Sequence, residues 1–135
     1  MALVVVTRLR LRDPEFFDEF FAAVVAVVEQ ATSGEDNLAA DVLAEASNTY
    51  WTRTCWQDAA AMRRFMVAEP HLSTMTRIDD WCDEATFASW EQADGVLPDW
   101  DDAYSRLIAQ GQVVHLTFES QANATRSFPP ISQPA

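Results

Sequence analysis

Two histidines are the side chains of this sequence whose ordinary pKa lies near neutral pH, and its other cationic side chains are nine arginines. His71 follows Pro70, where a new helix is expected to begin. A helix N-terminus disfavours the imidazolium, so a neutral His71 could act as a general base or a ligand. The alternative is that His71 only helps to cap that helix. His115 alternates with Val114 and Leu116 and is expected at the surface or in an interface.

Two arginines on the first predicted strand could stabilise an anion. Arg8 and Arg10 share a strand face with Val4 and Val6. If this face lines a cavity, Arg8 could stabilise an enolate or phenolate. If it reaches the rim of the sheet, both arginines face solvent or pair with the surplus acids. Arg53, on the third predicted strand, is a second candidate for the same role.

The third predicted strand, residues 49–56, alternates and is rich in aromatic residues. Its two faces carry different side chains: Tyr50, Thr52, Thr54 and Trp56 against Trp51, Arg53 and Cys55. Period-two spacing does not decide which face meets a cavity. Both tryptophans could be core residues. Alternatively, one set stacks on a planar substrate while Arg53 or Thr52 orients its oxygen atoms.

The acidic residues and cysteines do not indicate a metal site or a disulfide framework. Asp99, Asp101 and Asp102 begin a predicted helix, where acids complement the helix dipole. No histidine or glutamate has ligand-like spacing to them, so no metal is expected. Cys55 and Cys82 are expected to be buried free thiols.

The composition indicates one globular domain, since 49% of the 135 residues are hydrophobic. The net charge of −12 argues against nucleic acid and anionic membranes as partners. No apolar run approaches the roughly 20 residues of a membrane span, and the N-terminal residues lack signal-peptide features. We therefore expect a cytoplasmic location. With three glycines, the chain offers no phosphate-binding loop or dinucleotide fingerprint.

Hydrophobic periodicity predicts a series of strands and helices. They are a strand at 3–11, a helix from Asp13 to about Gly34, strands at 37–46 and 49–56, helical segments from Asp58 to about Glu84 that break at Pro70, and a strand at 85–91. The alanine-rich segment 37–46 could also be a helix. This order is the ferredoxin-like βαββαβ pattern of α+β proteins.

A further helix to about Gln110, a strand at 112–118 and an extended or mobile tail are expected after this pattern. The domain would thus span residues 1–118, and the tail 119–135. A four-stranded sheet with helices on one face leaves its other face bare, and this face would carry large apolar residues. Two copies that paired these faces would bury them, so we expect a homodimer.

Trp56 at a strand end, Phe65 nine residues later and the following Pro70-His71 resemble the dimeric α+β barrel superfamily, in particular antibiotic-biosynthesis-monooxygenase-like domains. The resemblance covers roughly residues 2–92. It implies several chemistries: oxidation of polycyclic phenols by dioxygen without a cofactor, haem binding or degradation, and isomerisation, cyclisation or dechlorination of small molecules. Haem-degrading members resemble one another in carrying a tryptophan where this chain has Phe65 and an asparagine where it has Thr7. Haem is therefore a minor possibility, and no cofactor is expected.

The resemblance favours a cofactor-independent monooxygenase, an oxidoreductase that acts on a planar aromatic or polyketide-like metabolite. The alternatives are a cyclase, isomerase or dehydratase of the same fold, or a non-catalytic binding protein. We expect His71 to be the base, and Arg8 or Arg53 to stabilise the anion. The expected substrate-binding residues are Thr7, Tyr50, Trp51, Trp56, Phe65 and Trp90.

Overall fold

A computed structural model describes residues 1–131 of the chain. Its first part follows the predicted order: β1 (Ala2–Leu11), the 3-10 helix η1 (Pro14–Phe16), α1 (Phe17–Ser33), β2 (Asn37–Glu45), β3 (Thr49–Trp56), α2 (Ala59–Val67), α3 (His71–Met75), α4 (Ile78–Trp81) and β4 (Cys82–Gln92). The ferredoxin-like α+β prediction is confirmed. The C-terminal part adds α5 (Trp100–Gln110), β5 (Gln112–Val113) and α6 (Gln121–Thr125).

The helix starts follow from side-chain caps that the sequence indicates. Asp13 accepts a hydrogen bond from the backbone N–H of Glu15, and Asp58 accepts one from that of Ala61. Asp99 caps α5 in the same way. Each cap satisfies a backbone donor that the first turn of a helix leaves unpaired.

The five strands form one antiparallel sheet in the order β2-β3-β1-β4-β5. The segment 37–46, for which a helix was the alternative, pairs with β3 as a strand. The register of β1 against β3 places Leu3 opposite Trp56 and Thr7 opposite Thr52. Because side chains alternate along a strand, this register puts Thr7, Thr52 and Trp56 on one face of the sheet.

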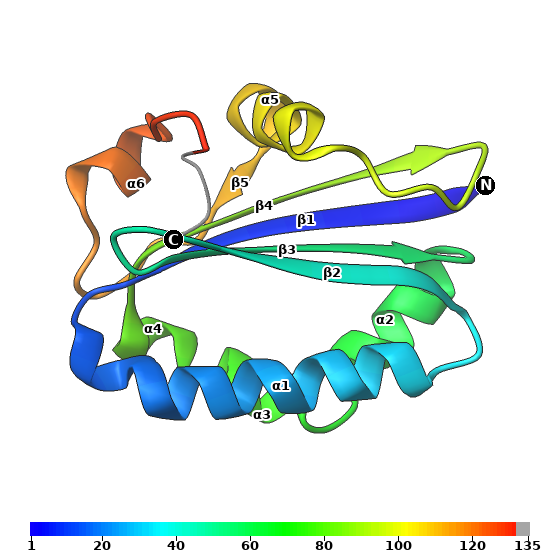
Figure 1. Cartoon of the computed structure of the whole chain (residues 1–135), viewed down its shortest axis with the longest axis horizontal. Helices are drawn as coiled ribbons and strands as arrows, with labels where there is room; N and C mark the ends of the chain where they lie inside the picture. The colour runs from blue at the N-terminus through cyan, green and yellow to red at the C-terminus, as the bar shows by residue number, and fades with distance from the viewer. Residues whose placement is uncertain (132–135) are drawn as a thin grey trace.

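The helices lie on both sides of this sheet. Helices α1 to α4 cover one face, and α5 and α6 lie over the other (Figure 1). On the second face, Val4, Val6 and Trp51 have no exposed surface, and Phe128 is 4% exposed. All four belong to one apolar cluster with Ala103 and Leu107 of α5. The prediction of a bare sheet face is therefore wrong, because the chain covers that face itself. The homodimer inferred from it loses its physical basis.

The segment after Glu119 is not the extended tail that its composition predicts. Ser120 caps α6 by accepting a hydrogen bond from the backbone N–H of Asn123. The buried Asn123 side chain accepts from the N–H of Ala85 and donates to the carbonyl oxygen of Val114. These bonds fasten α6 to β4 and to the residue that follows β5. The rest of the predicted tail, residues 132–135, lies outside the described residues.

Two predicted boundaries are wrong. The helical segment expected to reach Glu84 ends at Trp81, since Cys82 already pairs with β1 as part of β4. The strand expected over 112–118 ends at Val113. The N–H of Thr117 donates to the carboxylate of Asp79 (2.9 Å) rather than to a sheet neighbour. This contact takes the chain off the sheet edge.

Candidate functional site

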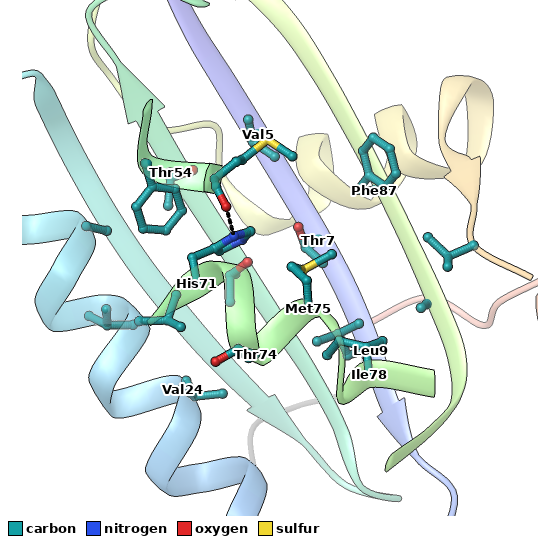
Figure 2. A pocket seen from close by; sticks show the side chains of 18 of the residues that line it. Val5, Thr7, Leu9, Val24, Thr54, His71, Thr74, Met75, Ile78 and Phe87 are labelled. Carbon is teal, nitrogen blue, oxygen red and sulfur yellow. Dashed lines mark hydrogen bonds between the residues drawn. The ribbon is translucent and has the colours of Figure 1, made fainter. Parts of the chain in front are cut away.

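A cavity of about 330 Å³ lies between the sheet and the helices of the first face. Strands β1 to β4 form one wall, and α1 to α4 form another. Figure 2 shows Val5, Thr7 and Leu9 on β1 and Thr54 on β3, with His71, Thr74 and Met75 of α3 nearby. Most lining side chains are apolar. The volume is at the lower end of the range of small-molecule sites, about 300–1,000 Å³.

His71 lines this cavity in a defined orientation. Its Nδ1 lies 3.1 Å from the carbonyl oxygen of Met66, and its backbone N–H donates to the side-chain oxygen of Gln30. A carbonyl oxygen only accepts, so Nδ1 must carry the proton and Nε2 the lone pair of the neutral ring. Burial lowers the pKa of His71, and the hydrogen bond to Met66 opposes this only in part. Nε2 has no hydrogen-bond partner among the described residues. A neutral His71 is therefore equipped to accept a proton.

The residues that suggested the family resemblance form one series of rings in tilted contact. The ring centroids of Trp56 and Phe65 are 4.7 Å apart, and those of Phe65 and His71 are 4.6 Å apart. All three residues line the cavity. The series links the end of β3 through α2 to the start of α3, and so fixes the imidazole against an aromatic wall.

The polar groups of the sheet wall are hydroxyls. Thr7, Thr52 and Ser89 line the cavity from β1, β3 and β4. Their hydroxyl groups have no hydrogen-bond partner among the described residues. Thr54 differs, because its hydroxyl accepts a bond from Trp56 Nε1 at 3.0 Å. The hydroxyls of Thr7, Thr52 and Ser89 can each donate to or accept from a bound molecule.

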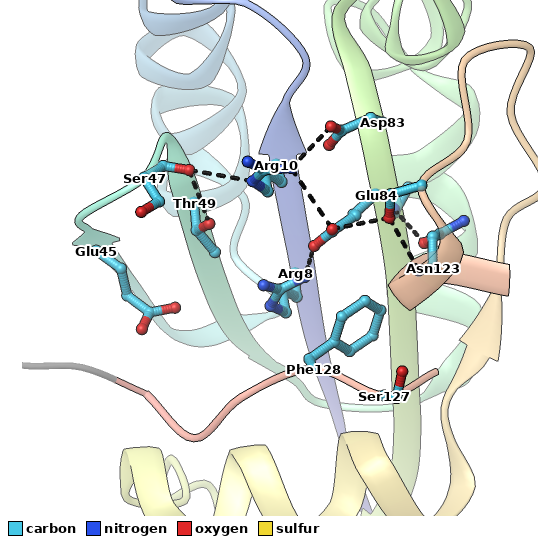
Figure 3. Close-up of polar contacts among 12 residues, drawn as sticks. Arg8, Arg10, Glu45, Ser47, Thr49, Asp83, Glu84, Asn123, Ser127 and Phe128 are labelled. Carbon is cyan, nitrogen blue, oxygen red and sulfur yellow. Dashed lines mark hydrogen bonds and ion pairs between the residues drawn. The ribbon is translucent and has the colours of Figure 1, made fainter. Parts of the chain in front are cut away.

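The predicted arginines lie on the other face of the sheet, away from His71. Arg8 is 4% exposed and donates to Glu84 at 2.6 Å, while the ring of Phe128 packs on its guanidinium (Figure 3). Arg53 pairs with Asp41 at 2.6 Å. Neither arginine lines the cavity. Both residues are one strand position out of phase with the cavity face, so the structure does not bring them together with His71.

Three of the predicted aromatic residues are also absent from the cavity wall. Trp51 lies on the second face, where its Nε1 donates to Glu45 at 2.6 Å. Trp90 packs against the same apolar cluster. Tyr50 is on the cavity face but packs on Phe20, with ring centroids 4.9 Å apart. Of the residues expected to be the base, the anion stabiliser or substrate-binding, the structure gathers four around the cavity: His71, Thr7, Trp56 and Phe65. Thr52, the alternative to Arg53 for orienting the oxygen atoms of a substrate, also lines it.

Sequence reasoning missed the part of the wall that comes from the C-terminal segment. Val114, His115 and Leu116 line the cavity after the chain leaves β5. Asp79 holds this segment by accepting from the backbone and the hydroxyl of Thr117, and these bonds lower the pKa of Asp79. No sequence pattern indicates this contact, because it joins α4 to the segment after β5 across 38 positions.

The cysteines and acids add no metal site. Cys55 and Cys82 are buried free thiols, as expected, and burial raises the pKa of Cys82 to about 12. Residues 1–131 contain no cluster of three or more histidine, cysteine or acidic side chains that could hold a metal ion. Across the same residues, no helix is long and apolar enough to cross a membrane.

Solved structures share this fold. The cofactor-independent oxygenase SnoaB from Streptomyces nogalater is 17% identical, with a TM-score of 0.58, over 73% of this chain and 98% of its own. A protein named antibiotic biosynthesis monooxygenase is 18% identical, with a TM-score of 0.60, over 68% and 99%. A conserved protein from Methanosarcina mazei Go1 is 16% identical, with a TM-score of 0.61, over 69% and 94%.

The chain therefore has the same fold as SnoaB and the protein named antibiotic biosynthesis monooxygenase. The family model of a domain of unknown function, DUF3291, matches residues 17–127, and the chain belongs to this family. A comparison with curated proteins finds no match. At these identities the solved structures establish the architecture alone.

Proposed function

We propose that the chain is a small-molecule enzyme in which His71 removes a proton from a planar, largely apolar substrate. The observation that supports this most is the free Nε2 of a neutral histidine in an apolar cavity. A general base must be unprotonated before it reacts, and the lowered pKa of the half-buried His71 keeps its ring neutral near pH 7. The likeness to SnoaB favours an oxygenase among the possible reactions.

In the proposed reaction, dioxygen oxidises an acidic C–H of a fused-ring ketone or phenol to a carbonyl. His71 accepts the proton, and the resulting anion passes one electron to dioxygen. The substrate radical and superoxide combine, and the peroxide takes the proton back from His71. Loss of water then leaves the carbonyl. One oxygen atom enters the product, and the other leaves in water with the two substrate hydrogens.

The residues around the cavity do not fit haem. The described residues that line it include no arginine to pair with the two propionates, and they include two acids, Asp41 and Asp79. Burying propionates without partners is costly. We therefore propose no step through haem, and the reaction above needs no cofactor from this chain.

Oxygen uptake with anthrone, a fused-ring ketone with an acidic CH₂ group, tests this proposal. We expect uptake by the wild type, with a product that has gained one oxygen and lost two hydrogens. His71→Gln should lower the rate by about 10²-fold or more. Arg63→Gln, an exposed change on α2, should keep it. Turnover without oxygen uptake would favour an isomerase or cyclase. If the protein neither binds nor converts any member of a panel of hydroxyarenes, the proposal is wrong.

A further inference from the structure

Thr7 and Thr52 form a cross-strand pair on the cavity wall. They are direct register partners on β1 and β3, and both line the cavity. Directly opposite residues of an antiparallel pair have Cβ atoms about 4.5–5.5 Å apart, so two hydroxyls can reach one ligand atom. Figure 2 shows Thr7 and His71 directed into the same space. Neither threonine hydroxyl has a partner among the described residues, so each needs a bond from water or a ligand.

The charges around the cavity disfavour an anion. The described lining residues include no arginine but two acids, Asp41 and Asp79. Arg8 is paired with Glu84, and Arg53 with Asp41. Asp79 lines the cavity, and its hydrogen bonds from Thr117 favour the charged carboxylate. The net charge of −12 adds long-range repulsion of anions.

We propose that the Thr7–Thr52 pair binds an oxygen atom of an uncharged hydroxy- or keto-arene and that the site rejects carboxylates. This rests on the proposed function only in requiring that the cavity binds a small molecule. The paired hydroxyls donate to a carbonyl or phenolic oxygen, and their bonds strengthen when that oxygen gains negative charge. The two hydroxyls would have the role that the sequence analysis gave to Arg8 or Arg53, which is to stabilise the oxygen anion of the substrate. Unlike an arginine, they carry no positive charge that would attract acidic ligands.

Three ligands with the same ring system test the proposal: 1-naphthol, naphthalene and 1-naphthoate, titrated by their own fluorescence near pH 7. Wild type should bind 1-naphthol at least about tenfold more tightly than 1-naphthoate, because the buried carboxylate would have no cation partner. Thr52→Val and Thr7→Val should each raise the Kd for 1-naphthol by about 3- to 10-fold and leave that for naphthalene unchanged. Thr32→Val, an exposed change on α1, should alter neither.

The possible failures are distinguishable. If 1-naphthoate binds as tightly as 1-naphthol, or if the two valine variants bind 1-naphthol normally, the proposed pair is wrong although the cavity remains a ligand site. If the variants lose affinity for naphthalene equally, the threonines only shape the cavity, and the oxygen contact is wrong. If none of the three ligands binds to wild type, both this proposal and the proposed function fail. Thermal unfolding of each variant confirms that the compared proteins are folded.

Discussion

His71 shows how one backbone contact can prepare a side chain for chemistry. The carbonyl of Met66 fixes the ring tautomer, and burial keeps the ring neutral. The sequence placed this histidine at a helix start but could not reveal the contact, because Met66 lies in the preceding helix and the chain turns at Pro70 in between.

The aromatic residues of the site were only half predictable. Trp56 and Phe65 reach the cavity, whereas Trp51 lies on the opposite face, a choice that strand alternation leaves open.

The lowered pKa of His71 should make stability depend on pH. The unfolded chain binds a proton near pH 6.5 that the folded chain binds only at lower pH. The free energy of unfolding of wild type should therefore fall, relative to that of His71→Gln, as the pH drops through about 6.5. Urea unfolding of both proteins at several pH values measures this difference. A difference that does not vary with pH would contradict the burial of a neutral ring.

Among the elements, the C-terminal segment is the one that contributes to both faces of the sheet. Val114 to Leu116 complete the cavity wall, and Phe128 packs over Arg8 on the second face. The composition of this segment, rich in serine, asparagine and proline, predicts a tail. It orders because a few bonds and one buried ring hold it: Asn123 to β4, and Phe128 to the core. Most elements from β1 to β4 were predictable, because β1 and β3 alternate along the strand and the helical segments after Asp13 and Asp58 begin at capping aspartates.

Two phenylalanines of this segment give a matched test of its packing. Phe128 is 4% exposed, and Phe118 is 50% exposed, with Arg12 over its ring. Phe128→Ala should lower the free energy of unfolding by about 3–5 kcal/mol. Phe118→Ala should cost about 1 kcal/mol or less. Chemical denaturation of the two variants measures both. Equal losses would show that the segment does not pack on the sheet as described.

At the scale of the whole molecule, one chain supplies the cover that the sheet needs. The second face buries Val4, Val6 and Trp51 under α5 and the segment that follows it. The predicted order of strands and helices was correct, but it left this face bare. The hydrophobic periodicity of residues 93–131 predicts a helix and a strand there, but it does not indicate that this segment packs back onto the sheet. The cavity lies between the sheet and α1 to α4, so its walls come from one copy.

The covered face predicts the state of the protein in solution. Light scattering after gel filtration should give the mass of a single chain at micromolar concentration, because pairing through this face would first require α5 and the segment after it to leave the sheet. A stable dimer that protects the backbone amides of β1 and β4 from hydrogen exchange, and loses protection on dilution, would contradict this account.

Nitrogen-15 NMR of the two histidine rings tests the central claim most directly, since with only His71 and His115 the spectrum has few signals. Near pH 7 we expect His71 to be neutral, protonated on Nδ1, and to show a shift of Nε2 when 1-naphthol is added. A positively charged ring, a proton on Nε2, or an unchanged Nε2 at saturating 1-naphthol would show that His71 is not a base facing the cavity.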